Sequence, residues 1–303
     1  MKIAVMGAFS YSGKYIAKRL LERGDRVITL TGHPRRPDPF DGRVQAFPLD
    51  FEDEVALARA LDGVQVLVNT YWIRFDRGSN TQDRAVENTR LLVKAAQQAG
   101  VERLIHISIT NPSSQTRLQY FRGKAANEEA IMQSGIPYAI LRPTILFGRE
   151  DILINNLAYL MRRFPFFLVP GDGTYRLQPV YVDDLAGLVS DAVYGGESYV
   201  VDAVGPEVFA FRDLVGLIGE AVARTPRVIS VPPWLALRSA QVLGGLMGDV
   251  LLTSQELEGL MANLLISEQP PRCQTKLSDW LRHHRATIGI RYASELDRHY
   301  RPA

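Results

Sequence analysis

Residues 2–13 read KIAVMGAFSYSG, a short apolar run that ends in a glycine-containing loop and leads into a helical pattern. The composition of Lys2–Met6 predicts a β-strand, and the spacing that follows predicts a helix over Ser12–Arg23 that stops at Gly24. A second predicted strand, Arg26–Thr31, closes a strand–helix–strand unit of about thirty residues. A loop at this place in such a unit is typical of dinucleotide binding, so this stretch decides the expected fold.

Short apolar runs and helical patterns continue to alternate as far as residue 148. The further expected strands are Val44–Leu49, Val64–Asn69, Arg103–Ser108 and Tyr138–Leu141. The further expected helices are Asp53–Leu61, Thr81–Ala99 and Leu118–Ser134. These strands are mostly apolar and β-branched, as in sheets covered on both faces. We therefore predict an α/β fold, a Rossmann-type doubly wound parallel sheet.

After residue 148 the pattern changes, to a helix near Ile152–Arg163, a Pro/Gly-rich segment over 164–173, and a strand at Tyr199–Asp202 that could return to the sheet. The last expected helices are near Phe211–Arg224, Pro233–Met247, Ser254–Leu265 and Ser278–His284, and Thr253 with Glu256 predicts a capping box. We expect a dinucleotide-binding domain over 1–148, its sheet completed by 174–202. Residues 149–173 and 203–303 would form a smaller, mainly helical part that binds a substrate or a partner.

Composition limits the function classes. The 303 residues carry a net charge of only +2, so we expect a small-molecule partner and no nucleic acid. The one cysteine, Cys273, excludes an internal disulfide, and the five histidines lack metal-binding spacing, so no metal site is expected. The first residues enter a strand without the features of a signal peptide, which predicts a cytoplasmic protein. Composition indicates neither the substrate nor the oligomeric state.

The most apolar later stretch is Trp234–Leu252, which Arg238, Gln241 and Asp249 interrupt. These polar residues argue against a transmembrane span. We expect a packed amphipathic helix here. The alternative is a peripheral contact of residues 234–252 with a membrane or a protein complex.

The glycine loop predicts where the cofactor binds. Gly7 would make the tight turn and Gly13 would let the helix pack on the strand, while Ser10 stands where the middle glycine is usual. Its side chain adds bulk, but its hydroxyl could bind phosphate. The diphosphate would lie at the helix N-terminus. The expected contacts are Gly7, Phe9, Ser10, Tyr11, Ser12 and Gly13.

The end of the second strand predicts the choice of nucleotide. Residues 31–36 read TGHPRR, with no carboxylate before Asp38 that could bind a ribose 2′-hydroxyl. Arginine binds phosphate through two parallel hydrogen bonds, so this loop could instead bind a 2′-phosphate. We expect NADP(H) rather than NAD(H), with contacts from Thr31, His33, Arg35 and Arg36. The alternative is a solvated arginine-rich loop.

These features together resemble the extended and atypical branch of the short-chain dehydrogenase/reductase superfamily, which includes NmrA-like proteins and the nucleotide-binding accessory subunit of respiratory complex I. The resemblance spans most of residues 1–202. Besides the loop, it rests on Leu49-Asp50-Phe51, Asn69-Thr70-Tyr71, Tyr120-x-x-x-Lys124, Leu141-Arg142-Pro143 and Val182-Asp183-Asp184-Leu185-Ala186. The run Phe147–Asp151 is most similar to the complex I subunit. By this resemblance, Asp50 and Phe51 would lie by the adenine, Asn69–Tyr71 by the diphosphate and ribose, and Pro143 with Thr144 by the nicotinamide.

The resemblance also implies the catalytic residues. Tyr120 and Lys124 share one helix face, so the ammonium can favour the phenolate of a tyrosine that acts as general acid and base. Ser108 would hold the substrate oxygen, and Lys124 would also bind the nicotinamide ribose. Gly123 should weaken this helix locally. His106 is expected to be a core residue rather than a ligand.

Three functions remain open. The first is an oxidoreductase that moves hydride between NADP(H) and a carbonyl or alcohol substrate, with Tyr120 as acid and base. The second is a non-catalytic NADP(H)-binding regulatory or complex-assembly protein, which Ser10 and the apolar 234–252 stretch favour. The third is a nucleotide-sugar epimerase or dehydratase.

Overall fold

The structure is a computed structural model that describes residues 1–33 and 36–300. Its centre is a seven-stranded sheet in the order β11-β6-β5-β4-β1-β2-β3. The strands are β1 (Lys2–Met6), β2 (Arg26–Thr31), β3 (Gln45–Pro48), β4 (Val66–Asn69), β5 (Arg103–Ile107), β6 (Tyr138–Pro143) and β11 (Tyr199–Ala203). Every adjacent pair is parallel. The predicted Rossmann-type sheet is confirmed, including the return of the last strand.

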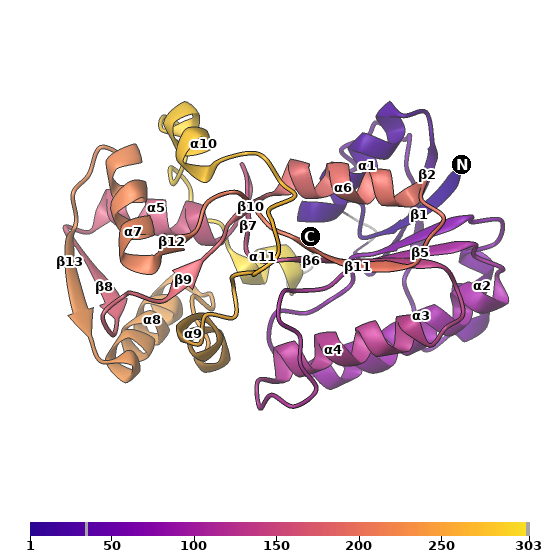
Figure 1. Cartoon of the computed structure of the whole chain (residues 1–303), viewed down its shortest axis with the longest axis horizontal. Coiled ribbons are helices and arrows are strands. Elements are labelled where there is room, and N and C mark those ends of the chain that lie inside the picture. Colours follow the sequence, from indigo (N-terminus) through magenta and orange to yellow (C-terminus); the bar gives the residue numbers. More distant parts are fainter. Residues whose placement is uncertain (34–35, 301–303) are drawn as a thin grey trace. The chain divides into compact units, whose positions relative to one another are not determined.

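Helices cover both faces of this sheet. They are α1 (Tyr11–Glu22), α2 (Glu54–Ala60), α3 (Gln82–Gln98), α4 (Gln119–Met132) and α6 (Val182–Val193). The helices α1 and α6 lie on one face and α2, α3 and α4 on the other (Figure 1). Strand order reverses between β1 and β4, which is where ligands bind in open α/β sheets, beyond the carboxyl ends of the strands.

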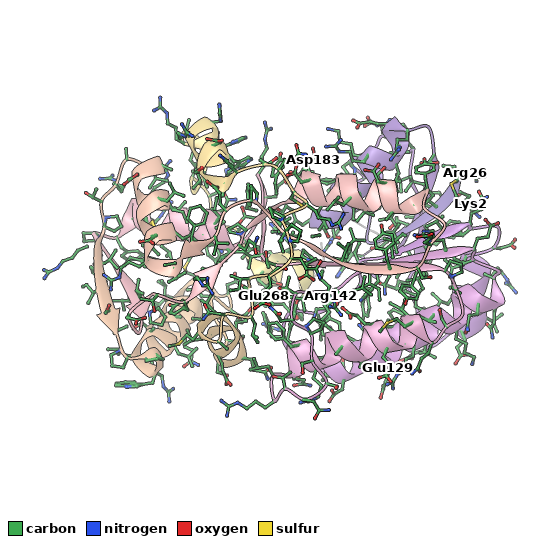
Figure 2. All side chains as sticks on the ribbon, in the orientation of Figure 1. Lys2, Arg26, Glu129, Arg142, Asp183 and Glu268 are labelled. Atoms are coloured by element: carbon green, nitrogen blue, oxygen red, sulfur yellow. The ribbon has the colours of Figure 1, made fainter. Side chains whose placement is uncertain are left out.

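The two helices on the first face are joined by a charged pair. The Arg19 guanidinium on α1 donates to both carboxylate oxygens of Asp183 on α6, over 3.0 and 2.7 Å. Asp183 is labelled in Figure 2. The sequence motif that begins at Val182 therefore fixes α6 against α1, within the part of the chain that carries the glycine loop.

The chain divides into two compact units. The first comprises Met1–Pro143 with Val182–Ala203, and the second comprises Thr144–Tyr181 with residues 204–300. The sequence placed the first change at residue 148 and the return at 174. The difference arises because β7 (Leu146–Phe147) pairs with β10 (Val180–Tyr181) and not with the large sheet.

The second unit has its own core and three two-stranded sheets. Besides β7 and β10, these pair β8 (Phe166–Pro170) with β13 (Arg227–Val231), and β9 (Arg176–Leu177) with β12 (Phe209–Ala210). Its helices are α5 (Leu153–Arg163), α7 (Phe211–Ala221), α8 (Pro233–Met247), α9 (Ser254–Met261), α10 (Leu277–His284) and α11 (Glu295–His299). The capping box of Thr253 and Glu256 is confirmed.

The expectation that 234–252 packs as an amphipathic helix is only partly correct. On α8 only Ala236 and Gly244 are buried. Trp234, Val242 and Leu246 are 66%, 67% and 82% exposed. No helix within residues 1–33 and 36–300 combines the length and the apolar character needed to cross a membrane.

Candidate functional site

The loop between β1 and α1 is held by its own backbone. Gly7 has a φ of 63°, a left-handed conformation that favours glycine, and its N–H donates to the Leu30 carbonyl over 3.0 Å. The N–H of Ser10 donates to the Gly7 carbonyl over 2.8 Å, and the Ser10 hydroxyl donates to the same oxygen over 2.6 Å. The serine hydroxyl thus bonds within the loop, while its oxygen keeps the capacity to accept a further hydrogen bond.

Gly13 fits the role predicted for the last glycine of the loop. A Cβ atom here would lie 2.2 Å from the Gly7 carbonyl oxygen and 3.1 Å from the Ala8 Cα. The first turn of α1 therefore touches the backbone of the loop. Tyr11 and Ser12 also lie in this turn, and the first turn of a helix is a common place for an anion to bind. The geometry fits a dinucleotide diphosphate.

Local hydrogen bonds hold the described residues that follow β2. Thr31 is buried, its hydroxyl accepts the N–H of His33 over 3.0 Å, and the His33 carbonyl accepts the N–H of Arg36 over 3.2 Å. Asp38 accepts two backbone N–H groups of its own turn, from Phe40 over 2.8 Å and from Gly42 over 2.7 Å. The nearest downstream carboxylate is therefore engaged locally. Arg35 lies outside the described residues.

Asn69 at the end of β4, Tyr71 after it and Phe51 after β3 form a connected group. The rings of Phe51 and Tyr71 lie 5.0 Å apart, and the Tyr71 N–H donates to the Asn69 side chain over 2.9 Å. The Thr70 hydroxyl donates to the Met6 carbonyl over 2.7 Å, which ties the end of β4 to the end of β1. Asp50 instead accepts the N–H of Glu52 in its own turn. The structure thus places Asn69 and Thr70 at the switch point of the sheet.

The predicted catalytic helix lies against the end of β5. Lys124 is 3% exposed, and its Nζ donates to the Ile107 carbonyl, directly before Ser108, over 2.9 Å. Burial lowers the pKa of Lys124 to about 7. Ser108 is buried, and its hydroxyl has no hydrogen-bond partner among the residues described. The structure therefore brings Lys124 next to the strand end that carries Ser108.

Trp72 is a residue of this site that the sequence analysis did not identify. Its ring lies 5.6 Å from the Tyr120 ring, edge to face, and 4.9 Å from Lys124 Nζ. A Cβ on Gly123 would lie 2.6 Å from the indole, so the glycine that weakens the helix makes room for this ring. Two signals were available: the tryptophan directly follows the Asn69–Tyr71 motif, and a glycine interrupts a helix.

The side chains of His106 and Asn127 are two further polar groups buried in the part of the structure that contains Lys124. His106 is fully buried, and burial together with nearby Lys124 holds its pKa well below the usual value, so it is neutral. Asn127, one helical turn beyond Lys124, is also fully buried, and neither of its amide atoms has a partner in the described structure. His106 is a residue of the strand core, as expected. Asn127 was missed because only the Tyr120 and Lys124 spacing pointed to function.

An ion pair joins α4 to the strand β6. The Arg142 guanidinium on β6 donates to both carboxylate oxygens of Glu128, the first contact being 2.9 Å long. Glu128 is buried and raises the pKa of Arg142 (labelled in Figure 2), and its charge also favours the charged form of Lys124. The Leu141–Pro143 motif thus anchors α4 to the sheet.

The two residues expected at the nicotinamide fall in different units. Pro143 ends β6, pairs with Ala203, and its carbonyl accepts the N–H of Thr110 over 3.0 Å. Thr144 is buried at the start of the second unit, where its hydroxyl donates to the Gln178 carbonyl. This hydroxyl therefore takes part in a structural hydrogen bond.

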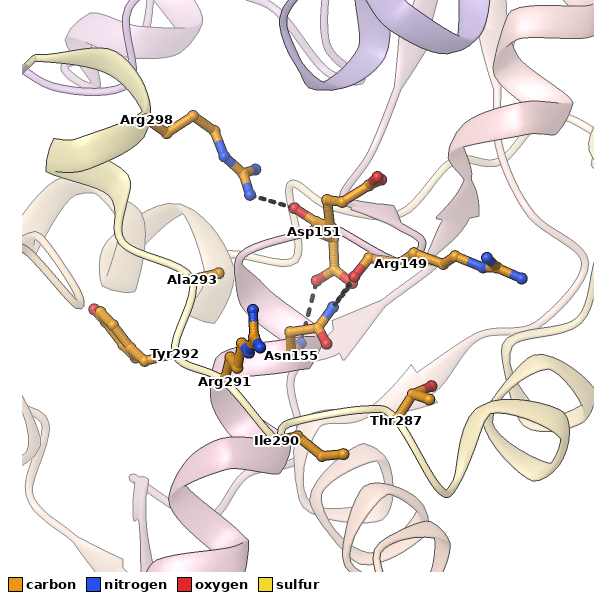
Figure 3. A pocket seen from close by; sticks show the side chains of 10 residues that line it. Arg149, Asp151, Asn155, Thr287, Ile290, Arg291, Tyr292, Ala293 and Arg298 are labelled. Carbon is orange, nitrogen blue, oxygen red and sulfur yellow. Dashed lines mark hydrogen bonds between the residues drawn. The ribbon is translucent and has the colours of Figure 1, made fainter. Parts of the chain in front are cut away.

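The Phe147–Asp151 run lies in the second unit. Asp151 is buried and accepts the N–H groups of Ile154 over 2.7 Å and Asn155 over 3.3 Å, which caps α5. Figure 3 shows the hydrogen bonds between Asp151 and Asn155 beside a cavity of about 460 Å3. The cavity is lined by Arg149, Glu150, Asp151, Asn155, Thr287, Ile290, Arg291, Tyr292, Ala293 and Arg298.

Comparison with known proteins identifies the first domain. Residues 7–154 match the family model described as NAD(P)H-binding. Subunit 9 of the NADH dehydrogenase [ubiquinone] 1 alpha subcomplex from Mus musculus is 32% identical over 224 residues, which cover 68% of this chain and 55% of that protein. The same subunit from Arabidopsis thaliana is 25% identical over 241 residues, 75% and 60% of the two chains. The chain thus spans little more than half of these mitochondrial relatives.

Solved structures agree on the fold. An NADPH-dependent quinone oxidoreductase from Escherichia coli, complexed with NADPH, superposes with a TM-score of 0.73 at 18% identity, covering 93% of this chain and 99% of that one. With the family match and the switch-point geometry, this gives the assignment. Residues 7–154 are an NAD(P)H-binding domain, and the fold of the chain is similar to that of NAD(P)-binding Rossmann proteins.

Proposed function

We propose that this chain is an NADP(H)-dependent oxidoreductase that moves hydride between NADP(H) and a carbonyl or alcohol substrate. One observation supports the proposal: Lys124 of α4 contacts the carboxyl end of β5, directly before Ser108, and Tyr120 of the same helix contacts Trp72 in the segment after β4. Lys124 Nζ bonds to the carbonyl before Ser108, and both Lys124 and Tyr120 contact Trp72. Ligands bind at this edge of such sheets.

Each residue would have a distinct role. Gly7, Gly13 and the first turn of α1 would hold the diphosphate, and bound NADP(H) would supply or accept the hydride. The Tyr120 phenol would exchange a proton with the substrate oxygen. The Lys124 ammonium would lower the pKa of that phenol. The buried Ser108 hydroxyl, which lacks a partner among the described residues, could donate to the same oxygen.

A preference for NADP(H) is part of the proposal. The nearest carboxylate after β2, Asp38, accepts two N–H groups of its own turn, whereas His33 and Arg36 lie in the loop between the strand and Asp38. A guanidinium there favours a 2′-phosphate over a ribose hydroxyl. The E. coli protein of similar fold was solved with NADPH. The second-strand loop thus favours the phosphorylated nucleotide.

The variant Tyr120→Phe tests the oxidoreductase. Turnover of any carbonyl substrate found with NADPH should fall by about 10²–10⁴-fold, because the proton donor is lost. The affinity for NADPH, measured by calorimetry, should stay unchanged. Tyr199→Phe, on the partly exposed edge strand β11, is the matched control and should keep full turnover. Equal turnover in Tyr120→Phe and the control would exclude Tyr120 as the acid.

The exposed face of α8 favours a second candidate, an NADP(H)-binding subunit that docks on a larger protein complex. Trp234, Val242 and Leu246 on this helix are mostly exposed, and large exposed apolar patches mark interaction surfaces. The mitochondrial relatives are named as subunits of NADH dehydrogenase. The occupant we propose is a protein partner.

A matched pair of valines tests this docking. Val242 on α8 and Val55 on α2 are each 67% exposed. Val242→Glu should abolish co-purification of the tagged chain with a defined complex from its native cells, and Val55→Glu should not. NADPH binding should be equal in both variants. Loss of the complex in neither variant would contradict docking through α8, and binding to protein-free lipid vesicles would assign the face to a membrane instead.

A further inference from the structure

We propose that Trp72 is a positioning residue that holds Lys124 and Tyr120 in the geometry needed at the nicotinamide end of the nucleotide. The inference rests on the proposed function. It concerns a side chain from the segment after β4 that contacts both functional residues of α4.

The segment that carries Trp72 is fixed on both sides. Before it, the Asn69 side chain accepts the N–H of Tyr71 over 2.9 Å, and the Tyr71 hydroxyl accepts the Asn88 amide over 2.9 Å. After it, the Gln82 side chain donates to the Arg74 carbonyl over 3.0 Å. Asn88 and Gln82 are both on α3, so the segment that carries the indole is held against a packed helix.

Gly123 leaves the space that the Trp72 indole occupies. A Cβ there would approach Trp72 Cη2 to 2.6 Å and Cζ2 to 3.2 Å, closer than side chains tolerate. The Val86 side chain on α3 would lie 3.4 Å from the same Cβ. The ring therefore fills a notch between α3 and α4 that only glycine leaves open at this position.

The Trp72 ring forms part of the environment of the Lys124 ammonium. It lies 4.9 Å from Nζ, within the range of a cation–π interaction, and it covers an ammonium whose hydrogen bond goes to the Ile107 carbonyl. The other charged or titratable groups around Lys124 are Glu128 on α4, His106 on β5 and, through Glu128, Arg142 on β6. Tyr120 packs edge to face on the ring.

Trp72 therefore couples two properties of the site. It fixes the direction of the Lys124 side chain, and it excludes water from the ammonium. Loss of the ring removes a cation–π contact that favours the ammonium, but it also admits solvent. Because burial is the largest cause of the lowered pKa, the pKa of Lys124 should rise from about 7 towards its usual value. Tyr120 would also lose the neighbour that fixes the angle of its ring.

Three variants distinguish the effect of where the Trp72 ring lies from the effect of its size. Trp72→Ala removes the ring, Trp72→Phe keeps an aromatic face, and Gly123→Ala displaces the ring without removing it. Trp280→Phe, in the core of the second unit, is the control. Lysine labelled with ¹³C and ¹⁵N gives six side-chain signals, and Lys124→Arg assigns the one of interest. The pKa of Lys124 is then read by NMR with no need for turnover.

We expect the Lys124 pKa to rise by about one unit or more in Trp72→Ala and Gly123→Ala, and to stay near the native value in Trp72→Phe. NADPH should bind about tenfold more weakly to the first two variants, with Trp72→Phe restoring most of the affinity. A Lys124 titration unchanged in all three variants would overturn the proposal. That result is distinguishable from failure of the oxidoreductase, which would leave these titrations intact while no substrate turned over.

Discussion

Replacing Gly13 by alanine tests the deciding feature of the fold, the close approach of α1 to the loop. The new Cβ would lie 2.2 Å from the Gly7 carbonyl oxygen and 2.8 Å from its carbon. Both are backbone atoms, so no flexible side chain can move aside. Either α1 shifts away from β1 or the loop loses its turn, and both changes remove N–H groups from the diphosphate site.

The magnitude follows from two opposing terms. Alanine in a helix is favoured over glycine by about 1 kcal/mol, and overpacking of a rigid site costs about 1–3 kcal/mol or more. Gly187 on α6 provides the matched control, because a Cβ there meets nothing within 4 Å. Gly187→Ala should therefore stabilise the protein slightly. Because both variants gain the same helix term, they should differ by the overpacking cost alone, about 1–3 kcal/mol.

The assay uses the single tryptophan among the described residues of the first unit, Trp72. With Trp234 and Trp280 replaced by phenylalanine, urea unfolding followed by fluorescence reports on that unit. The same proteins are then heated with and without NADPH. Saturating nucleotide should raise the stability of Gly187→Ala by about 2.7 kcal/mol at 100 times its Kd, and should add little to Gly13→Ala.

One outcome would refute this reasoning. If Gly13→Ala unfolds at the same urea concentration as Gly187→Ala and keeps its NADPH affinity, the helix does not need backbone contact with the loop. The diphosphate site would then have to lie elsewhere in the first unit.

Further predictions concern charge. Burial raises the pKa of Asp151 to about 6, so the folded state holds more protons than the unfolded state between about pH 4 and 6. The free energy of unfolding should therefore fall by about 3 kcal/mol as pH rises through that window. Denaturation curves of Asp151→Asn should lack this pH dependence. The same pH dependence in the variant and the native protein would contradict the cost of burying the Asp151 carboxylate. Glu128→Gln leaves the Arg142 guanidinium without its charged partner and should lower the unfolding free energy by about 3 kcal/mol. The control Glu54→Gln breaks the exposed ion pair with Lys94 and should leave the unfolding free energy unchanged. Arg36→Ala should weaken NADPH binding by about tenfold and leave NADH binding unchanged in calorimetry, and an equal loss for both nucleotides would argue against a 2′-phosphate contact.

Much of the fold follows from local pattern. The strands β1 and β2 have the same bounds in sequence and structure, because apolar runs with clear glycine boundaries leave little choice. The β3 strand is shorter than expected, Gln45–Pro48 instead of Val44–Leu49, since it pairs on one side only at the sheet edge. The short strand β8 was not predicted at all. Phe166–Pro170 becomes a strand only because Arg227–Val231, from a distant part of the chain, pairs with it.

Individual residues of the candidate site, like the first strands, could be identified from the sequence, but their arrangement could not. Gly7 and Gly13 were identifiable from the spacing of the loop, whereas Ser108, Tyr120 and Lys124 were singled out by the family resemblance. Their role as a group still requires the sheet order, which brings the ends of β1, β4 and β5 together.

The sequence by itself determined the glycine loop, the parallel α/β class and the absence of a carboxylate after the second strand, because these depend on neighbouring residues and on periods of a few residues. Only the tertiary structure decided that the Ser10 hydroxyl bonds back to Gly7, that Trp72 sits on Gly123 and that Lys124 is buried beneath it. The Ser10 bond depends on the exact turn of its loop, and the Trp72 and Lys124 contacts require a side chain to meet a partner on another packed element. Such contacts depend on how helices and strands fit together, which no local pattern encodes.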